Sequence, residues 1–360
     1  MIDGLGVCKS AQAGAEGSLM NIVEIALFVG LSLSFLMAVA LGGNDAASPT
    51  ANVVGARVMT IRRAVVLFTV FTTVGALSQG YMNMKTVGTG IVPGINLLGA
   101  IVIILAAFTW IMVCNFKGLE ISVTHTVVGS ILGYGVAAYG VGGVQWGMIQ
   151  TVVLSWFTSP VLAAVVAFAL HRLLLAMVRR FESWERSMVV VLKLALCYSA
   201  YAFGANDIAN ATGVYVTVTK IAMGSPPEGS VMFMLAIFGS IGVVVGGFWL
   251  GPKVIETVAF NIIRLNVASA TAATVANALV VHLFVTIPYM VIGYGVPIST
   301  SLANIGALVG VGFSSYGYSG INKTTVGTLV VCWVLSVGGT ALVTYTLYSL
   351  LLPITGPILS

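Results

Sequence analysis

Two Asn-Asp pairs stand in otherwise apolar surroundings. The first lies in the stretch GGNDAASPTANVV (42–54) and the second in GANDIANATGVYV (204–216), each directly after a long apolar run. An isolated charge at the centre of a membrane helix costs about 2.5–3.5 kcal/mol on insertion scales, so Asp45 and Asp207 need compensation. Carboxylate, amide and hydroxyl oxygens are the ligands of small hard cations. The pairs therefore predict two cation sites; in the alternative, each Asp only caps a half-helix.

Residues that interrupt helices follow both pairs. Pro49 cannot donate the hydrogen bond that a continuing helix requires. The second pair is followed by Asn210 and Gly213. We expect both helices to unwind near the pairs and to expose backbone carbonyls as further cation ligands, as broken helices in transporters do.

Two clusters of hydroxyl residues form a second kind of candidate site. They lie in SVTHT (122–126) and PISTSLAN (297–304), and their members are Ser122, Thr124, Thr126, Ser299, Thr300 and Ser301. In re-entrant hairpins, such clusters would direct hydroxyls and helix N-termini at one point, and N-termini attract anions. In the alternative, each hydroxyl bonds to a carbonyl one turn earlier in its own helix.

The charges near these clusters favour co-transport. No Lys or Arg lies at the centre of an expected span, and two carboxylates would repel an anion. An anion bound here should therefore arrive with cations that bridge it to Asp45 and Asp207. His125, between Thr124 and Thr126, could relay a proton or contact the anion. It could equally pack with one ring nitrogen bonded to a carbonyl.

The composition is that of an integral membrane protein. Of 360 residues, 59% are hydrophobic and 7% charged, whereas soluble domains carry roughly 25% charged residues. The alternation of a β-barrel is absent. We therefore expect an all-α polytopic membrane protein with about ten to twelve transmembrane helices. The ten apolar stretches lie near 22–43, 64–82, 95–114, 126–142, 147–170, 188–205, 231–250, 268–292, 303–318 and 326–350.

The basic residues predict the orientation. With both termini outside, all but three of the fifteen Lys and Arg residues lie at inner ends, as the positive-inside rule requires. The three on the outer side are Lys9, Lys85 and Lys220. The expected parts are an outer tail (1–20), a first repeat (21–170), a cytoplasmic linker (171–187), a second repeat (188–352) and an outer tail (353–360).

Several other functions are disfavoured. The sequence holds no nucleophile–base pair, no metal-ligand spacing and no P-loop, so we expect neither an enzyme nor ATP-driven transport. The four cysteines form no CxxC motif. Because the basic residues are scattered at helix ends, a nucleic-acid partner is not expected, and the first twenty residues do not read as a cleaved signal peptide.

The two halves of the chain repeat one another. Gly42, Asn44, Asp45 and Ala47 match residues 162 positions later, and the hydroxyl clusters match at a distance of 177. A weaker match pairs MKTVGTGI (84–91) with IETVAFNI (255–262). Five crossings in each half make this an inverted-topology repeat, typical of secondary transporters. We expect transport by rocking of one repeat against the other.

These motifs resemble the duplicated signatures of the inorganic phosphate transporter (PiT) family, over roughly residues 24–350. The resemblance implies symport of inorganic phosphate with Na⁺ or, in some members, H⁺. It also implies two re-entrant hairpins meeting at a central site, and a homodimer. Carried over, the family's phosphate site falls on Asn44, Asn206, Ser122, Thr124, Ser299, Thr300 and Ser301. Its Na⁺ sites fall on Asp45 and Asp207 with Ser48 and Asn210.

Five residues depart from the family pattern. Val123 removes a hydroxyl, Leu302 stands in place of a His, and Glu120 stands where the family usually has Pro. Pro49 replaces a small residue, and Thr72 a Glu. The alternatives to a Na⁺-coupled phosphate symporter are therefore an H⁺-coupled one, a sulfate permease of the same fold, or, more remotely, a channel or non-transporting scaffold. The short linker indicates the plasma membrane of a bacterium or archaeon.

Overall fold

The computed structural model describes residues 4–180, 184–262, 264–317 and 323–359. In these ranges the regular elements are helices, and eight of them are long and apolar enough to cross a membrane. Helices satisfy their backbone hydrogen bonds internally, as the bilayer requires. The prediction of an all-α polytopic membrane protein is confirmed.

The elements run in the same order in both halves. The first half contains α1 (Gly4–Asp45), α2 (Ala47–Gly55), α3 (Ile61–Gln79), α4 (Tyr81–Lys85), η1 (Thr86–Gly90), α5 (Leu97–Lys117), α6 (Val123–Tyr139), η2 (Val141–Gly143) and α7 (Trp146–Arg180). The second half contains α8 (Trp184–Thr212), η3 (Gly213–Tyr215), α9 (Val216–Ala222), α10 (Glu228–Trp249), α11 (Gly251–Asn261), α12 (Val267–Ile292), α13 (Thr300–Tyr316) and α14 (Lys323–Leu359). Two of the ten predicted stretches, 126–142 and 303–318, thus correspond to the shorter helices α6 and α13.

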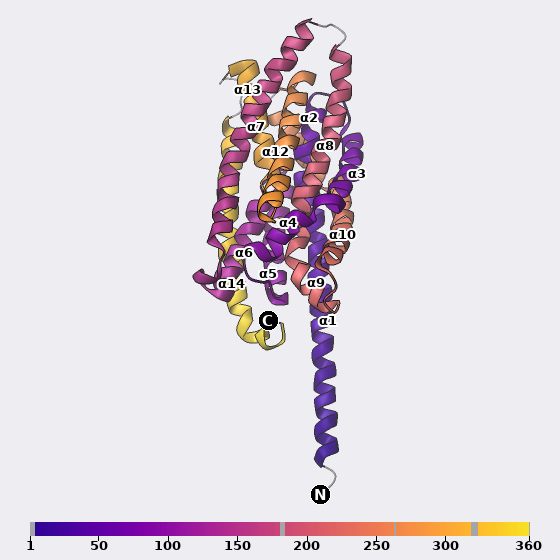
Figure 1. The fold of residues 1–360 in the computed structure, drawn as a ribbon, viewed down its shortest axis with the longest axis vertical. Coiled ribbons are helices and arrows are strands. Elements are labelled where there is room, and N and C mark those ends of the chain that lie inside the picture. Colours follow the sequence, from indigo (N-terminus) through magenta and orange to yellow (C-terminus); the bar gives the residue numbers. More distant parts are fainter. Residues whose placement is uncertain (1–3, 181–183, 263, 318–322, 360) are drawn as a thin grey trace.

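The long helices extend into the expected linker and tails. Helix α1 begins at Gly4 and α14 ends at Leu359, both at the lower end of the bundle (Figure 1). Helices α7 and α8 reach the opposite end, where α7 continues to Arg180 and α8 starts at Trp184. Most of the predicted linker is therefore helical, and residues 181–183 lie outside the described ranges.

The two halves are interleaved. Helix α3 packs on α8, α10 on α1, α6 on α14 and α13 on α7, so each pair joins one helix from each half. The pairs approach closely at glycines: a Cβ on Gly204 would lie 2.0 Å from the Thr72 carbonyl oxygen, and one on Gly246 1.9 Å from that of Val39. Small residues at such crossings let helix backbones pack tightly in membranes.

Helices α6 and α13, which begin at the two hydroxyl clusters, make equivalent close contacts with α14 and α7. A Cβ on Gly129 of α6 would lie 2.5 Å from the Val337 carbonyl oxygen of α14, and one on Gly306 of α13 2.3 Å from that of Pro160 of α7. Gly306 lies 177 positions after Gly129, and Val337 lies 177 positions after Pro160. This is also the spacing of the two hydroxyl clusters. Equivalent residues of the two halves therefore build equivalent crossings.

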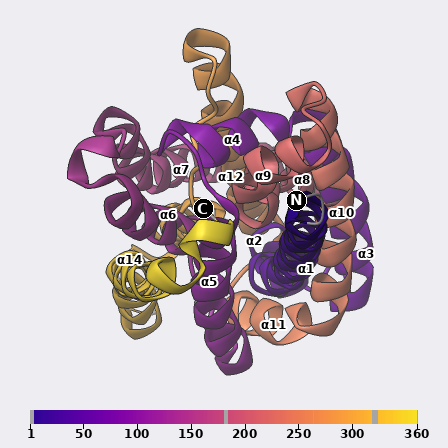
Figure 2. The same ribbon diagram turned by 90° about the horizontal axis from the view of Figure 1, so that it is seen from below.

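The interleaving divides the molecule into two mixed groups of helices: α1, α3, α8 and α10 in one, and α6, α7, α13 and α14 in the other. Figure 2 shows α1, α3, α8 and α10 on one side and α6, α7 and α14 on the other. Helix α5 packs on both α1 and α14, and α12 on both α8 and α7, so these two helices connect the groups. Rocking of one repeat against the other would separate all four tightly packed pairs, so the packing favours movement of these mixed groups; the mode of transport stays a prediction.

Candidate functional site

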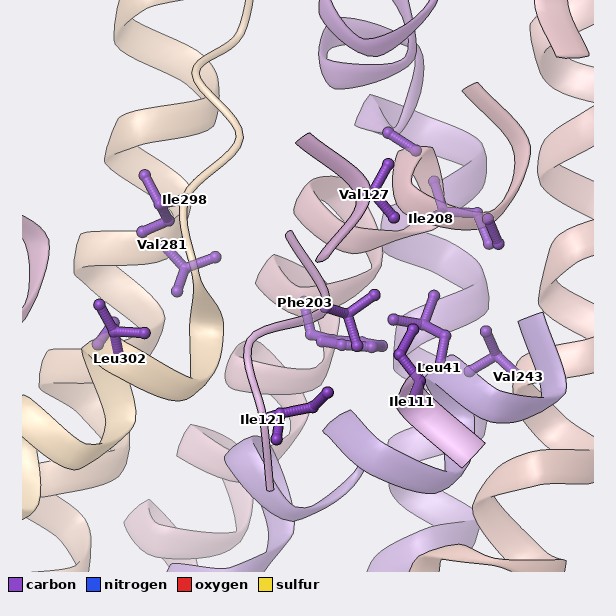
Figure 3. Packing of buried hydrophobic residues seen from close by; sticks show 14 of the residues in the cluster. Leu41, Ile111, Ile121, Val127, Phe203, Ile208, Val243, Val281, Ile298 and Leu302 are labelled. Carbon is purple, nitrogen blue, oxygen red and sulfur yellow. The ribbon is translucent and has the colours of Figure 1, made fainter. Parts of the chain in front are cut away.

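Two hairpins, α5–α6 and α12–α13, carry the hydroxyl clusters at the starts of their second helices. Gly118 (φ +69°) caps the C-terminus of α5 and Gly293 (φ +74°) that of α12, both in the left-handed conformation that favours glycine. The chain then reaches the first turns of α6 and α13 through Ile121 and Ile298, which are fully buried (Figure 3). The N-termini of both helices therefore lie in the protein interior, where their positive partial charge is little screened by water.

The predicted serines Ser122 and Ser299 cap these two helices. Their hydroxyl oxygens accept the backbone N–H groups of His125 and Leu302, each at 3.2 Å. The hydroxyl oxygen at an N-cap satisfies one of the amides left free at a helix start. Equivalent residues thus cap both hairpin helices in the same way.

The hairpin tips hold each other by reciprocal hydrogen bonds. Thr124 Oγ1 donates to the Ile298 carbonyl at 3.0 Å, and Ser301 Oγ donates to the Ile121 carbonyl at 3.1 Å. The two donors are 177 positions apart in the sequence, and so are the two acceptors. Two predicted anion ligands are thereby brought together at the meeting point of α6 and α13.

Removing either reciprocal bond is expected to loosen this contact. Thr124→Val and Ser301→Ala should each lower the free energy of unfolding by about 1 kcal/mol, and by more if the freed carbonyl stays dry. Thermal unfolding of the detergent-solubilised protein measures this. The control is Thr158→Val, whose exposed hydroxyl bonds only to its own helix at Leu154; equal destabilisation in the control would contradict the assignment.

Asn44 and Asn206 clamp the hairpin backbones. Asn44 Oδ1 accepts the Ile121 N–H at 3.0 Å, and its Nδ2 donates to the Leu119 carbonyl at 3.0 Å. Asn206 Oδ1 accepts the Ile298 N–H at 3.2 Å, and its Nδ2 donates to the Ile298 carbonyl at 2.8 Å. These two predicted phosphate ligands therefore connect α1 and α8 of one helix group to the hairpins of the other.

Asp207 lies in a network with two other predicted ligands. Its Oδ1 accepts from Asn210 Nδ2 at 2.9 Å and from Thr124 Oγ1 at 3.4 Å. Asn210 Nδ2 also approaches Thr124 Oγ1 at 3.1 Å. Asp207 Oδ2 and Asn210 Oδ1 are buried with no hydrogen-bond partner. Thr124, a predicted anion ligand, is thus in direct contact with the predicted cation ligands Asp207 and Asn210. One oxygen atom of Asp207 and one of Asn210 make no hydrogen bond.

Asp45 lies at the end of α1, close to a third carboxylate. Its Oδ1 is buried and has no hydrogen-bond partner. Ser48, expected beside it as a cation ligand, instead donates its hydroxyl to Glu120 Oε1. Asp45 is within electrostatic range of both Asp207 and Glu120. Within the described ranges, no lysine or arginine contacts any of these carboxylates.

Helices α1 and α8 are less disrupted near the Asn-Asp pairs than the sequence predicted. Helix α1 is interrupted at Ala46 alone, and Pro49 lies in the first turn of α2, where its missing N–H would have no helical partner anyway. Helix α8 stays regular through Asp207 to Thr212 and tightens only at η3, which starts at Gly213. The expectation of an unwound helix at the second Asn-Asp pair is therefore wrong.

Two other predicted residues lie outside this set of hydrogen bonds. Thr300 is close to Asp207, but its Oγ1 is buried without a hydrogen-bond partner. His125 packs edge-on against Trp156, with 3.8 Å between ring centroids, and lines an apolar cavity between α7, α13 and α14. Neither ring nitrogen of His125 has a hydrogen-bond partner. Its expected role as a proton relay therefore stays a prediction.

Three buried polar residues of the site were absent from the predicted set. Glu120 contacts Ser48, Asn83 Nδ2 donates to Asn206 Oδ1 at 2.9 Å, and Asn115 Oδ1 accepts from Asn44 Nδ2 at 2.7 Å. Each contacts a residue in the predicted set: Ser48, Asn206 or Asn44. In the sequence, each is a polar residue within or beside an apolar stretch. Other Asn residues stand in similar places, so this feature alone does not identify members of the site.

Comparison with known proteins gives a consistent result. A family model described as the phosphate transporter family matches residues 41–195 and 179–344. The chain is 28% identical to a putative phosphate permease of Thermococcus kodakarensis, covering 92% of this chain and 99% of that protein. It is 23% identical to a putative phosphate permease of Haemophilus influenzae, covering 84% of this chain and 91% of that one.

A solved structure shares the fold. It is described as "The sodium-dependent phosphate transporter", is 27% identical in sequence and superimposes with a TM-score of 0.81. The match covers 92% of this chain and all of that one.

Proposed function

Because this chain belongs to the phosphate transporter family, a family of transporters and not of enzymes, we propose that it imports inorganic phosphate together with Na⁺ by alternating access. The resemblance noted in the sequence is confirmed at the level of the family. One observation carries the proposal: Asp207 is in direct contact with Thr124, at the point where the N-termini of α6 and α13 meet.

Phosphate would bind between the two hairpins. The converging N-termini supply partial positive charge, and Thr124, Ser301 and the unpartnered Thr300 supply hydroxyl donors. In the conformation described, Thr124 and Ser301 donate to carbonyls of the opposite hairpin. An entering phosphate would have to take over these hydroxyl groups, so binding is coupled to a separation of the hairpin tips.

Cations would make this binding favourable. Three buried carboxylates repel an anion, and no basic side chain contacts them among the described residues. Buried charges are tolerated when they are paired or hold a metal ion. The unpartnered oxygens of Asp45, Asp207 and Asn210 suit Na⁺, which prefers oxygen ligands. Na⁺ at Asp45 and Asp207 would neutralise the site before phosphate enters.

The two helix groups suggest how the site would open. Asp45 and Asp207 belong to the group of α1, α3, α8 and α10, whereas the hairpin helices belong to the other group. The site therefore lies at the boundary between the groups, which Asn44 and Asn206 bridge. A rotation of one group against the other, guided by α5 and α12, would expose the site to one side of the membrane at a time.

Uptake of radiolabelled phosphate into proteoliposomes tests the proposal. We expect uptake under an inward Na⁺ gradient, little with neither gradient, and no inhibition by excess sulfate. Uptake driven only by an inward H⁺ gradient would replace Na⁺ by H⁺ as the coupling ion. Inhibition by sulfate, or absence of phosphate uptake under every gradient, would contradict phosphate as the substrate.

The remaining parts of the proposal concern the cellular setting. Relatives from archaea and bacteria and the short linker support the plasma membrane of such an organism. The positive-inside pattern supports termini on the outer side. The family resemblance supports a homodimer, which chemical cross-linking of the purified protein would test.

A further inference from the structure

Glu120 is a third carboxylate at the site, placed where the family resemblance expects proline. It stands in the extended stretch between α5 and α6, and only 1% of its surface is exposed. Its Oε1 accepts the hydroxyl of Ser48, whereas Oε2 is buried with no hydrogen-bond partner. A buried carboxylate left half-satisfied is costly unless something else neutralises it.

Further oxygen atoms surround this carboxylate. Ser48 comes from α2, and the Ser301 hydroxyl, from the opposite hairpin, also interacts with Glu120. Asp45 adds negative potential from the end of α1. Oxygen atoms from three segments therefore meet here, as in a cation site. The hydrogen bond from Ser48 leaves the second carboxylate oxygen of Glu120 without a partner.

A cavity leads away from Glu120. It has a volume of about 190 Å³ and is lined by Glu120, Thr257 and Asn261 of the α11 side, and Thr324 and Thr328 of α14. Lys253 and Arg264 flank this part of the chain, which the positive-inside rule predicts to face the cytoplasm. Apolar side chains, including Val258, Ile262 and Leu329, form most of the wall, and the volume is large enough for several water molecules beside Glu120.

We propose that a cation binds at Glu120, with the hydroxyls of Ser48 and Ser301 as further ligands, as a third site beside those at Asp45 and Asp207. The site lies next to this cavity, on the side that the positive-inside rule predicts to face the cytoplasm. The inference rests on the proposed Na⁺ coupling and extends it: an ion held at Glu120 and carried with the anion adds one Na⁺ per phosphate. A relative with proline at this position would lack this ion.

Equilibrium binding of radioactive Na⁺ to the purified full chain in detergent tests the site. We expect Glu120→Gln to bind one Na⁺ fewer per chain than the wild type. The matched control is Glu256→Gln, which makes the same change at an exposed carboxylate on α11 and should bind the wild-type number. Equal Na⁺ numbers for Glu120→Gln and wild type would overturn the inference.

Two further variants separate ion binding from folding. Glu120→Asp keeps the carboxylate one methylene further back, so it should bind the wild-type number of ions with lower affinity. Glu120→Pro introduces the residue that the resemblance expects in this stretch, and it should also bind one Na⁺ fewer. If Glu120→Gln does not fold, Glu120→Pro decides the question by the same count.

Transport measurements test the third Na⁺ site separately from the proposed Na⁺-coupled import of phosphate. In proteoliposomes, the number of Na⁺ ions per phosphate should be one lower for Glu120→Gln than for the wild type. Na⁺-driven uptake with the same ratio in both would overturn the third site and leave Na⁺ coupling standing. A wild type that binds the extra Na⁺ but takes up phosphate without a Na⁺ gradient would overturn the coupling and leave the site standing.

Discussion

Asp207→Asn should abolish Na⁺-driven phosphate uptake while leaving the protein folded. The substitution preserves the shape of the side chain, and its remaining oxygen can still accept from Asn210 and Thr124. It removes the negative charge that would hold Na⁺ beside the hairpin tips. Losing even an outer-shell partner of a metal ligand typically costs 10–100-fold, so losing a charged ligand should lower uptake by at least about 100-fold.

Uptake of radiolabelled phosphate into proteoliposomes under an inward Na⁺ gradient measures the effect, and size-exclusion chromatography checks the fold. Asp45→Asn should behave in the same way, because Asp45 also has an unpartnered buried oxygen. The control is Glu24→Gln, an exposed carboxylate on α1. The assignment fails if either Asp variant transports at the wild-type rate with an unchanged dependence on Na⁺.

The second large effect concerns folding. Gly204→Ala should destabilise the protein strongly, although it adds only one methyl group. The new Cβ would lie 2.0 Å from the Thr72 carbonyl oxygen and 2.9 Å from the Ala76 nitrogen, both backbone atoms of α3 that cannot rotate away. Overpacking of side chains costs about 1–3 kcal/mol. A clash between two backbones should reach or exceed the upper end of that range.

The measurement is the temperature of thermal unfolding in detergent, together with the yield of monodisperse protein. Gly339→Ala is the control, because it adds the same methyl group to α14 where no atom lies within 4 Å. It should unfold at the wild-type temperature. A Gly204→Ala protein as stable as this control would show that α3 and α8 are not packed as described.

The sequence predicted the type of fold because apolar length alone identifies membrane helices. It also located both hairpin helices, since Ser122 and Ser299 recur at one spacing and cap α6 and α13. It did not predict which helices pack together. The glycine pairs that join α3 to α8 and α1 to α10 are visible in the sequence, but a glycine does not indicate which of several helices fills the space beside it.

The sequence identified polar residues that the structure brings together, but it did not predict the contacts they make. Asn44 and Asn206 lie at the site, yet both clamp hairpin backbones, because an amide can bind a peptide group as well as a ligand. Ser48 donates to Glu120, a partner 72 positions away that no local pattern reveals. Helix α8 continues past Asp207 because no proline follows the pair there, and the helix supplies its own hydrogen bonds.

The interleaved halves have a consequence for the biogenesis of the protein. Helices α1 and α3 are synthesised first, but the helices that cover their glycine faces, α10 and α8, belong to the second half of the chain. At translation rates of ~5–20 residues per second, the first half waits on the order of ten seconds in the bilayer with these faces unpaired. Lipid or the insertion machinery must cover them during that interval, and neither half provides a complete fold for the other to join.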